Sequence, residues 1–231
     1  MNAAGAPAHR RISLAAGIAY LLTFVSIPTL ALYSSVKGAN YVLGSGPDTA
    51  AIVGGMLEII VALAGIATAV ILFPMLKKQN ESFAVGLVAA RILESGTIFV
   101  GVAFLLSIVT LRQNGTGAGA GVMATSHALV ALYDRIFLLG QSFMPAVCDL
   151  LLGYMLYTSR LVPRRLSIIG IVGGPLLVIG YIAILFGAID QHGALAGLSA
   201  LPVAVFEFGL GIWLIVKGFN PEAVAALESK S

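Results

Sequence analysis

Five charged side chains lie in stretches of sequence that are otherwise apolar enough to cross a lipid bilayer. Arg91 and Glu94 are three residues apart in one apolar run, so on a helix they share a face and can pair. Glu58, Asp149 and Glu207 each lie in a different apolar run. Ionisable groups at this depth are costly and usually face a bundle interior or a wet cavity. We therefore take these five residues as a candidate buried charge cluster and ligand-binding site.

The charges of these five residues do not balance. A rise of about 1.5 Å per helical residue places all of them near the bilayer centre. One guanidinium and four carboxyl groups would carry a net charge of −3 if all ionised. Hydrocarbon does not tolerate such a charge, so protonation, a bound cation or entering water must compensate it.

Two interpretations of this cluster stay open. It can bind a small polar or cationic solute, as in a small transporter or binding protein. Alternatively, the buried charges only lock the helix bundle of a non-catalytic structural or regulatory membrane component. A cavity that brings water to Arg91 would favour the first interpretation, and a dry, fully paired network the second. Substrate, coupling ion and oligomeric state stay open.

The composition excludes an ordinary water-soluble protein. The chain has 231 residues, of which 59% are hydrophobic and 10% are charged, whereas soluble domains are about 25% charged. The net charge of +3 is small, and the basic residues are scattered at the ends of apolar runs, which is not a nucleic-acid-binding pattern. The expected partner is the lipid bilayer.

The apolar runs predict an all-α polytopic membrane protein, a bundle of six transmembrane helices in one membrane domain. Segments rich in glycine, proline and polar residues separate the runs. The expected spans are residues 12–34, 49–76, 83–111, 133–157, 166–189 and 195–216. Residues 122–132 are either an interfacial segment or the beginning of the fourth span. Pro28 is expected to kink the first span.

The distribution of basic residues predicts the orientation. With the N-terminus inside, the inner segments hold nine Lys and Arg residues, and the outer loops hold only Lys37 and Arg112. Positive charge concentrates on the cytoplasmic side of membrane proteins. We therefore expect both termini in the cytoplasm and the protein in the cytoplasmic membrane.

Catalytic and metal-binding patterns are weak. The three histidines do not have the spacing of metal ligands, and no nucleophile stands near a recognisable base. We predict no catalytic residue, no metal and no cofactor, and favour a protein that is not an enzyme. A third interpretation is an outer-facing hydrolase, with His127 and His192 near Asp134 and Asp190.

Several short motifs are distinctive in combination. They are Leu57-Glu58 with Ala62-Leu63-Ala64, Leu72-Phe73-Pro74-Met75-Leu76-Lys77, Arg91-Ile92-Leu93-Glu94, Ser159-Arg160-Leu161-Val162-Pro163-Arg164, Leu201-Pro202 to Glu207, and Trp213-Leu214-Ile215-Val216-Lys217-Gly218-Phe219-Asn220. From Arg11 to Asn220, the chain resembles a bacterial family of six-span membrane proteins catalogued as domain of unknown function 4386. The resemblance implies an integral protein of the cytoplasmic membrane and supplies no activity.

Overall fold

The computed structural model describes residues 5–114 and 119–229, and within these ranges the regular elements are all helical. The elements in chain order are α1 (Gly5–Leu22), η1 (Thr23–Ser26), α2 (Thr29–Leu32), η2 (Tyr41–Leu43), α3 (Thr49–Leu76), α4 (Glu81–Gln113), α5 (Ala120–Phe137), η3 (Leu138–Phe143), α6 (Met144–Ser159), α7 (Arg164–Leu185), α8 (Ala194–Val216) and α9 (Pro221–Glu228). Six helical stretches in the described chain are long and apolar enough to cross a membrane.

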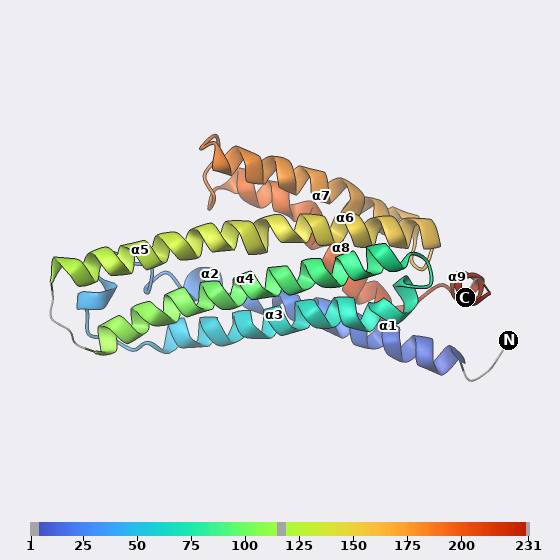
Figure 1. The fold of residues 1–231 in the computed structure, drawn as a ribbon, viewed down its shortest axis with the longest axis horizontal. Coiled ribbons are helices and arrows are strands. Elements are labelled where there is room, and N and C mark those ends of the chain that lie inside the picture. The colour runs from blue at the N-terminus through green and yellow to red at the C-terminus, as the bar shows by residue number, and fades with distance from the viewer. Residues whose placement is uncertain (1–4, 115–118, 230–231) are drawn as a thin grey trace.

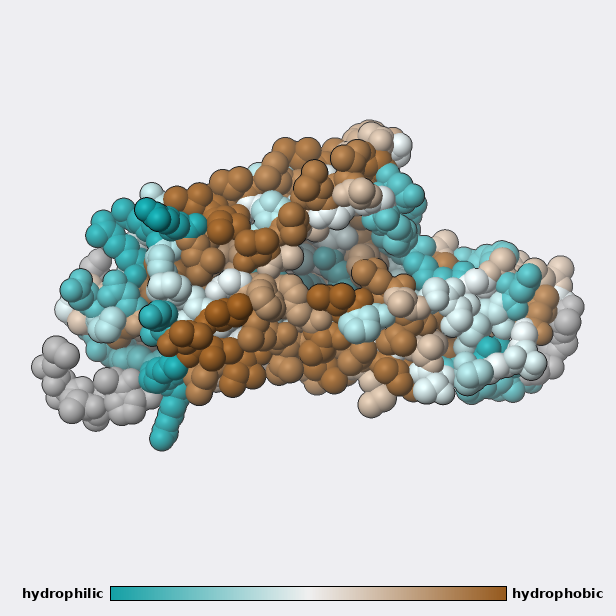
Figure 2. Space-filling model, turned by 180° about the vertical axis from the view of Figure 1, so that it is seen from behind, coloured by the Kyte–Doolittle hydropathy of each residue, from teal (hydrophilic) through white to brown (hydrophobic). Residues whose placement is uncertain are grey.

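The surface of the bundle is itself apolar. Large hydrophobic side chains are exposed along most spans; Leu30, Ile179 and Leu198 are more than 60% exposed. They form a broad hydrophobic band over the middle of the molecule, with hydrophilic residues at both ends (Figure 2). A helix that is hydrophobic all round is suited to contact with lipid. The expectation of an all-α, six-span membrane protein is confirmed.

The spans form two groups that meet near the end of the molecule where both termini lie (Figure 1). Helices α3, α4 and the α5–α6 pair run side by side along the long axis. The α7–α8 hairpin packs on α6 and α1. The element that carries Glu207 is therefore packed on α1 and α7, and at the other end Gln191 of the α7–α8 turn donates to the backbone carbonyl oxygen of Asp134 in α5 at 3.0 Å.

Close glycine contacts anchor the α7–α8 hairpin. A Cβ on Gly17 of α1 would lie 2.7 Å from the carbonyl oxygen of Gly211 in α8. A Cβ on Gly170 of α7 would lie 2.7 Å from the ring of Phe206. Small residues let membrane helices approach this closely. These contacts fix the rotation of α8 at the position next to Glu207.

The observed helices differ from the predicted spans at three places. The first span begins earlier, at Gly5, and is interrupted by η1 before Pro28, as expected for a proline-disrupted helix. Residues 122–132 belong to the fourth helical stretch, which runs without a break from Ala120 to Ser159. The fifth helix ends at Leu185, because Gly187 turns the chain with a φ of 71°. Helix α3 has the predicted bounds, Thr49–Leu76.

Candidate functional site

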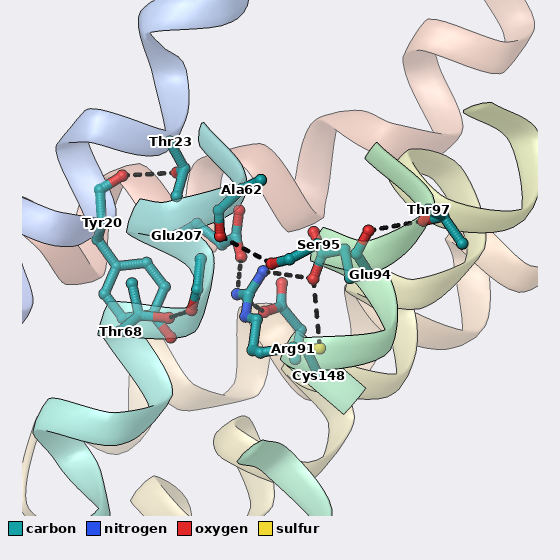
Figure 3. Close-up of polar contacts among 12 residues, drawn as sticks. Tyr20, Thr23, Ala62, Thr68, Arg91, Glu94, Ser95, Thr97, Cys148 and Glu207 are labelled. Carbon is teal, nitrogen blue, oxygen red and sulfur yellow. Dashed lines mark hydrogen bonds and ion pairs between the residues drawn. The ribbon is translucent and has the colours of Figure 1, made fainter. Parts of the chain in front are cut away.

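Arg91 lies at the junction of α4, α6 and α8 and contacts an acidic residue from each (Figure 3). Its Nη1 donates to Glu94 Oε2 at 2.9 Å, one turn along α4. Its Nη2 donates to Glu207 Oε1 of α8 and lies 3.9 Å from Asp149 Oδ1 of α6. We call these four residues the Arg91 cluster. The cluster ties three spans together at one guanidinium.

The Arg91 cluster is buried but unequally so. Arg91 and Asp149 are 2% and 0% exposed, whereas Glu94 and Glu207 each keep 8%. Within the described chain, neither carboxylate oxygen of Asp149 has a hydrogen-bond donor. One guanidinium thus stands against three carboxyl groups, which would carry a net charge of −2 if all ionised. Protons or a further cation must complete the charge balance.

Neighbouring groups hold the cluster in place. Cys148 Sγ lies 3.6 Å from Glu94 Oε2 and donates a weak hydrogen bond to it. The guanidinium of Arg91 lies 5.8 Å from the ring centroid of Tyr20 in α1. Ser95 Oγ donates to the carbonyl oxygen of Ala62 at 2.7 Å and joins α4 to α3. The contact of Tyr20 with Arg91 could not be predicted from sequence, since an aromatic residue in an apolar span is most often a core residue.

Glu58 has different partners. Tyr133 Oη of α5 donates to Glu58 Oε1 at 2.9 Å, and Gln141 Nε2 donates to the same oxygen at 3.3 Å. Among residues 5–114 and 119–229, Arg91 forms no ion pair with Glu58. Of the five predicted site residues, the structure brings Glu94, Asp149 and Glu207 together around Arg91. It places Glu58 in a separate hydrogen-bonded group.

A cavity of about 390 Å³ ends on the Arg91 cluster. Arg91, Glu94 and Glu207 line its inner end, and a hollow with hydrophilic residues at its base interrupts the hydrophobic band in Figure 2. The cavity extends toward the α7–α8 turn, where Gln191 lines it. It therefore leads from the cluster toward the end of the molecule opposite the termini.

Polar side chains also line the cavity walls. They are Thr23, Ser95, Gln141, Ser142, Tyr181, Gln191 and Ser199. Gln141 lies in η3, which is a π-helix, a form that is frequent at functional sites. Because Gln141 also donates to Glu58, it connects the cavity with the second buried carboxyl group. Sequence reasoning missed Gln141, although a glutamine within a long apolar run is a signal in itself.

The four residues of the hydrolase interpretation do not form a shared site, although Gln191 of the turn that holds Asp190 and His192 donates to the backbone carbonyl oxygen of Asp134 at 3.0 Å. Asp134 pairs with Lys37 at 2.5 Å, His127 Nε2 lies 3.2 Å from a backbone carbonyl oxygen, and Asp190 accepts a hydrogen bond from the backbone of His192. In the part of the chain that the structure describes, no three His, Cys, Asp or Glu side chains are placed to hold a metal ion. The geometry gives this interpretation no support.

Comparison with protein families identifies a match. The model of a family described as "Domain of unknown function (DUF4386)" matches residues 15–218, a range that includes all five predicted site residues. Comparison with curated proteins and with solved structures gives no match.

Proposed function

Because the chain belongs to the DUF4386 family, whose description names no activity, we propose a function from its cavity: the protein binds a small cationic or polar solute, as a small transporter or binding protein. The binding residues are Glu94 and Glu207, with Arg91 holding both carboxylates in position. Asp149 does not line the cavity and adds a third carboxyl group 3.9 Å from Arg91.

The observation that carries this proposal is the excess of acid at the end of a cavity. Glu94 and Glu207 share one guanidinium and retain exposed surface on the cavity side. Asp149 adds a third carboxyl group without a hydrogen-bond donor in the described chain. Buried charge is stable only when it is compensated, so a cationic ligand at this place would complete the site.

The size and lining of the cavity favour a small organic cation over a bare metal ion. Small-molecule sites range upward from about 300 Å³ and combine apolar walls with a few polar groups. The cavity volume of about 390 Å³ and the aromatic side chains of Phe24, Phe137 and Tyr181 fit this description. A metal ion such as Ca²⁺ requires about six or more oxygen ligands, and a protonated amine requires far fewer.

The orientation forms part of the proposal. The inner segments predicted from sequence carry nine of eleven loop and terminal basic residues, which supports cytoplasmic termini in the plasma membrane. The cavity leads away from the end that holds the termini. The solute would then enter from outside the cell.

The structural alternative also has an observation in its favour. Arg91 is 2% exposed and bridges Glu94 and Glu207 across two helices, as a locking group would. A structural ion pair of this kind does not require more carboxyl groups than guanidinium groups, however. The adjoining cavity, which ends on Glu94 and Glu207, is the feature that the structural interpretation leaves without a role.

Ligand-dependent thermal stability tests the proposal. The purified protein in detergent would be heated with ammonium, methylammonium, tetramethylammonium or agmatine chloride, against sodium chloride of equal ionic strength. Binding to the folded state raises the melting temperature. We expect at least one organic cation to do so in the wild type and not in Glu94→Gln.

The matched control is Glu81→Gln. Glu81 is exposed at the beginning of the same helix, so its substitution removes the same charge far from the cavity and should leave the shift intact. No shift with any cation in a folded wild-type protein, or an equal shift in Glu94→Gln, would favour the locking role.

A further inference from the structure

A second cavity lies at the opposite end of the bundle, where both termini are. It has a volume of about 700 Å³ and lies between the α6–α7 connection and the α8–α9 connection. Its lining includes four cationic side chains and a tryptophan: Arg160, Arg164, Arg165, Lys217 and Trp213. We call it the basic pocket. Four cations around one cavity form a concentrated positive field.

In the described part of the chain, the cations of the basic pocket form no ion pair with an acidic residue. Arg164 donates from Nε to the Tyr157 carbonyl oxygen at 3.3 Å and stacks over its ring. Lys78 at the same end of the molecule forms an ion pair with Glu228. Basic residues at this end can therefore pair with an acidic residue.

The backbone around the basic pocket has a defined conformation. Arg160 ends α6 with a φ of 58°, a left-handed conformation that costs energy for a residue other than glycine. The amide of Asn220 donates to the carbonyl oxygen of Leu161 at 2.9 Å and joins the two connections. Leu161 is 0% exposed and Val162 is 3% exposed. The short connection is thus anchored in the core while its arginines remain outside.

The position of the pocket points to a lipid. Helix α7 begins at Arg164 and α8 ends at Val216, so the pocket lies where the spans leave the hydrocarbon. Trp213 belongs to the residue type that is enriched at this interface. The apolar side chains of Ile168, Ile212 and Val216 are exposed between 43% and 62% on the adjoining spans, and they offer a surface to acyl chains that begin at the pocket.

We propose that the basic pocket binds the phosphate headgroup of an anionic phospholipid. Arginine matches phosphate oxygens with paired N–H donors, and basic pockets at the ends of membrane helices bind such headgroups. A zwitterionic headgroup brings its own ammonium group, which four cations repel. This site is separate from the Arg91 cluster and does not depend on its function.

Trp213 provides a direct measurement, because it is the single tryptophan of the chain and lines the pocket. The full chain in neutral detergent would be titrated with short-chain phosphatidylglycerol while tryptophan emission is recorded. We expect a saturable change in emission. Phosphatidylcholine of the same chain length and inorganic phosphate should give none at equal concentration.

Two double variants distinguish lipid binding at the basic pocket from attraction to the positive surface as a whole. Arg165→Gln with Lys217→Gln should weaken phosphatidylglycerol binding by about tenfold or more, since each basic residue near a membrane contributes substantially. Arg11→Gln with Lys77→Gln removes two exposed charges from the same end, outside the pocket, and should change binding by less than about twofold.

Three results would overturn the proposal. Equal weakening in both double variants would mean attraction to the surface as a whole. A pocket variant that binds as the wild type does would exclude these cations from the site. Inorganic phosphate that binds as tightly as phosphatidylglycerol would mean a free-anion site and no lipid preference. Cooperative thermal unfolding of each variant shows that it is folded.

Discussion

The structure holds two groups of buried carboxyls whose surroundings differ. Glu58 accepts hydrogen bonds from the neutral side chains of Tyr133 and Gln141. In the Arg91 cluster, a permanently charged guanidinium meets three acids and adjoins a cavity. Both groups lie in apolar spans. The depth of a carboxyl group in the membrane therefore does not indicate its role. The charge of its neighbours and its access to water indicate that role.

The two groups also differ in what they join. The Tyr133–Glu58 hydrogen bond connects α5 to α3, two helices that both pack against α4. The Arg91–Glu207 pair connects α4 to the α7–α8 hairpin, which packs mainly on α6 and α1. A change in the Arg91–Glu207 pair would alter the packing of the hairpin against the other spans. We expect substitutions to separate the two groups clearly.

The largest effect is expected at Arg91. Arg91→Met removes the cation shared by Glu94, Glu207 and Asp149, and breaking a buried pair in this way costs about 3–5 kcal/mol. The variant should melt far below the wild type in detergent or fail to fold. Arg135→Met is the control, because Arg135 is exposed on α5. Equal stability of the two variants would contradict the central role of Arg91.

A smaller effect is expected at Glu58. Glu58→Leu leaves the Tyr133 hydroxyl without its acceptor, which costs about 1–3 kcal/mol. Glu58→Gln keeps a carbonyl acceptor and should cost less. Melting temperatures in detergent measure both changes, with Tyr133→Phe as the reciprocal control. If Glu58→Leu were as damaging as Arg91→Met, the distinction between the two groups would be wrong.

Much of this arrangement could be predicted from sequence. The contacts that could not be predicted share one physical reason. Polar flanks define the ends of α3, and the i, i+3 spacing predicts the Arg91–Glu94 contact that the structure contains. Sequence position also estimates how deep each acid lies. It does not give the rotation of a helix about its axis, and that rotation decides which neighbour an acid faces.

Asp149 and Gln141 illustrate this missing rotation. Close glycine packing along α7 sets how α6 and α8 lie against it, and Asp149 then faces Arg91. The π-helix η3 changes the register of the chain before α6, so the direction of Gln141 could not be inferred from α-helical periodicity. Both are consequences of packing between helices distant in sequence.

Residues that line the cavity should be accessible to water, whereas residues on the lipid-facing surface should not. A Ser199→Cys variant, made with Cys148→Ser so that it carries the only thiol, places a cysteine on the cavity wall. A cationic methanethiosulfonate reagent should modify it in membranes. Leu93→Cys in the same background is the control, because Leu93 is 58% exposed but faces lipid near the middle of α4. Faster modification at Leu93 than at Ser199 would mean that the cavity is closed to water.

The smallest effect is expected for an acid–base pair outside the hydrocarbon, where Asp48 pairs with Arg112. Partial burial acts to raise the pKa of Asp48, but hydrogen bonds from Tyr41 and Gln113 and the charge of Arg112 outweigh it and lower that pKa. A lowered pKa in the folded state means that the stabilisation is present at neutral pH and is lost as the carboxylate takes up its proton, below about pH 4.

Asp48→Asn should therefore reduce the melting temperature at pH 7 by a small amount, corresponding to about 1 kcal/mol or less, and the difference from the wild type should shrink as the pH falls. The reason is solvation: water screens this pair, whereas the Arg91 cluster has little water to replace a lost partner. Melting curves between pH 7 and pH 3 measure the effect, with Asp190→Asn in the α7–α8 turn as the control. A loss at pH 7 as large as that of Arg91→Met would show that location in the membrane does not set the strength of these pairs.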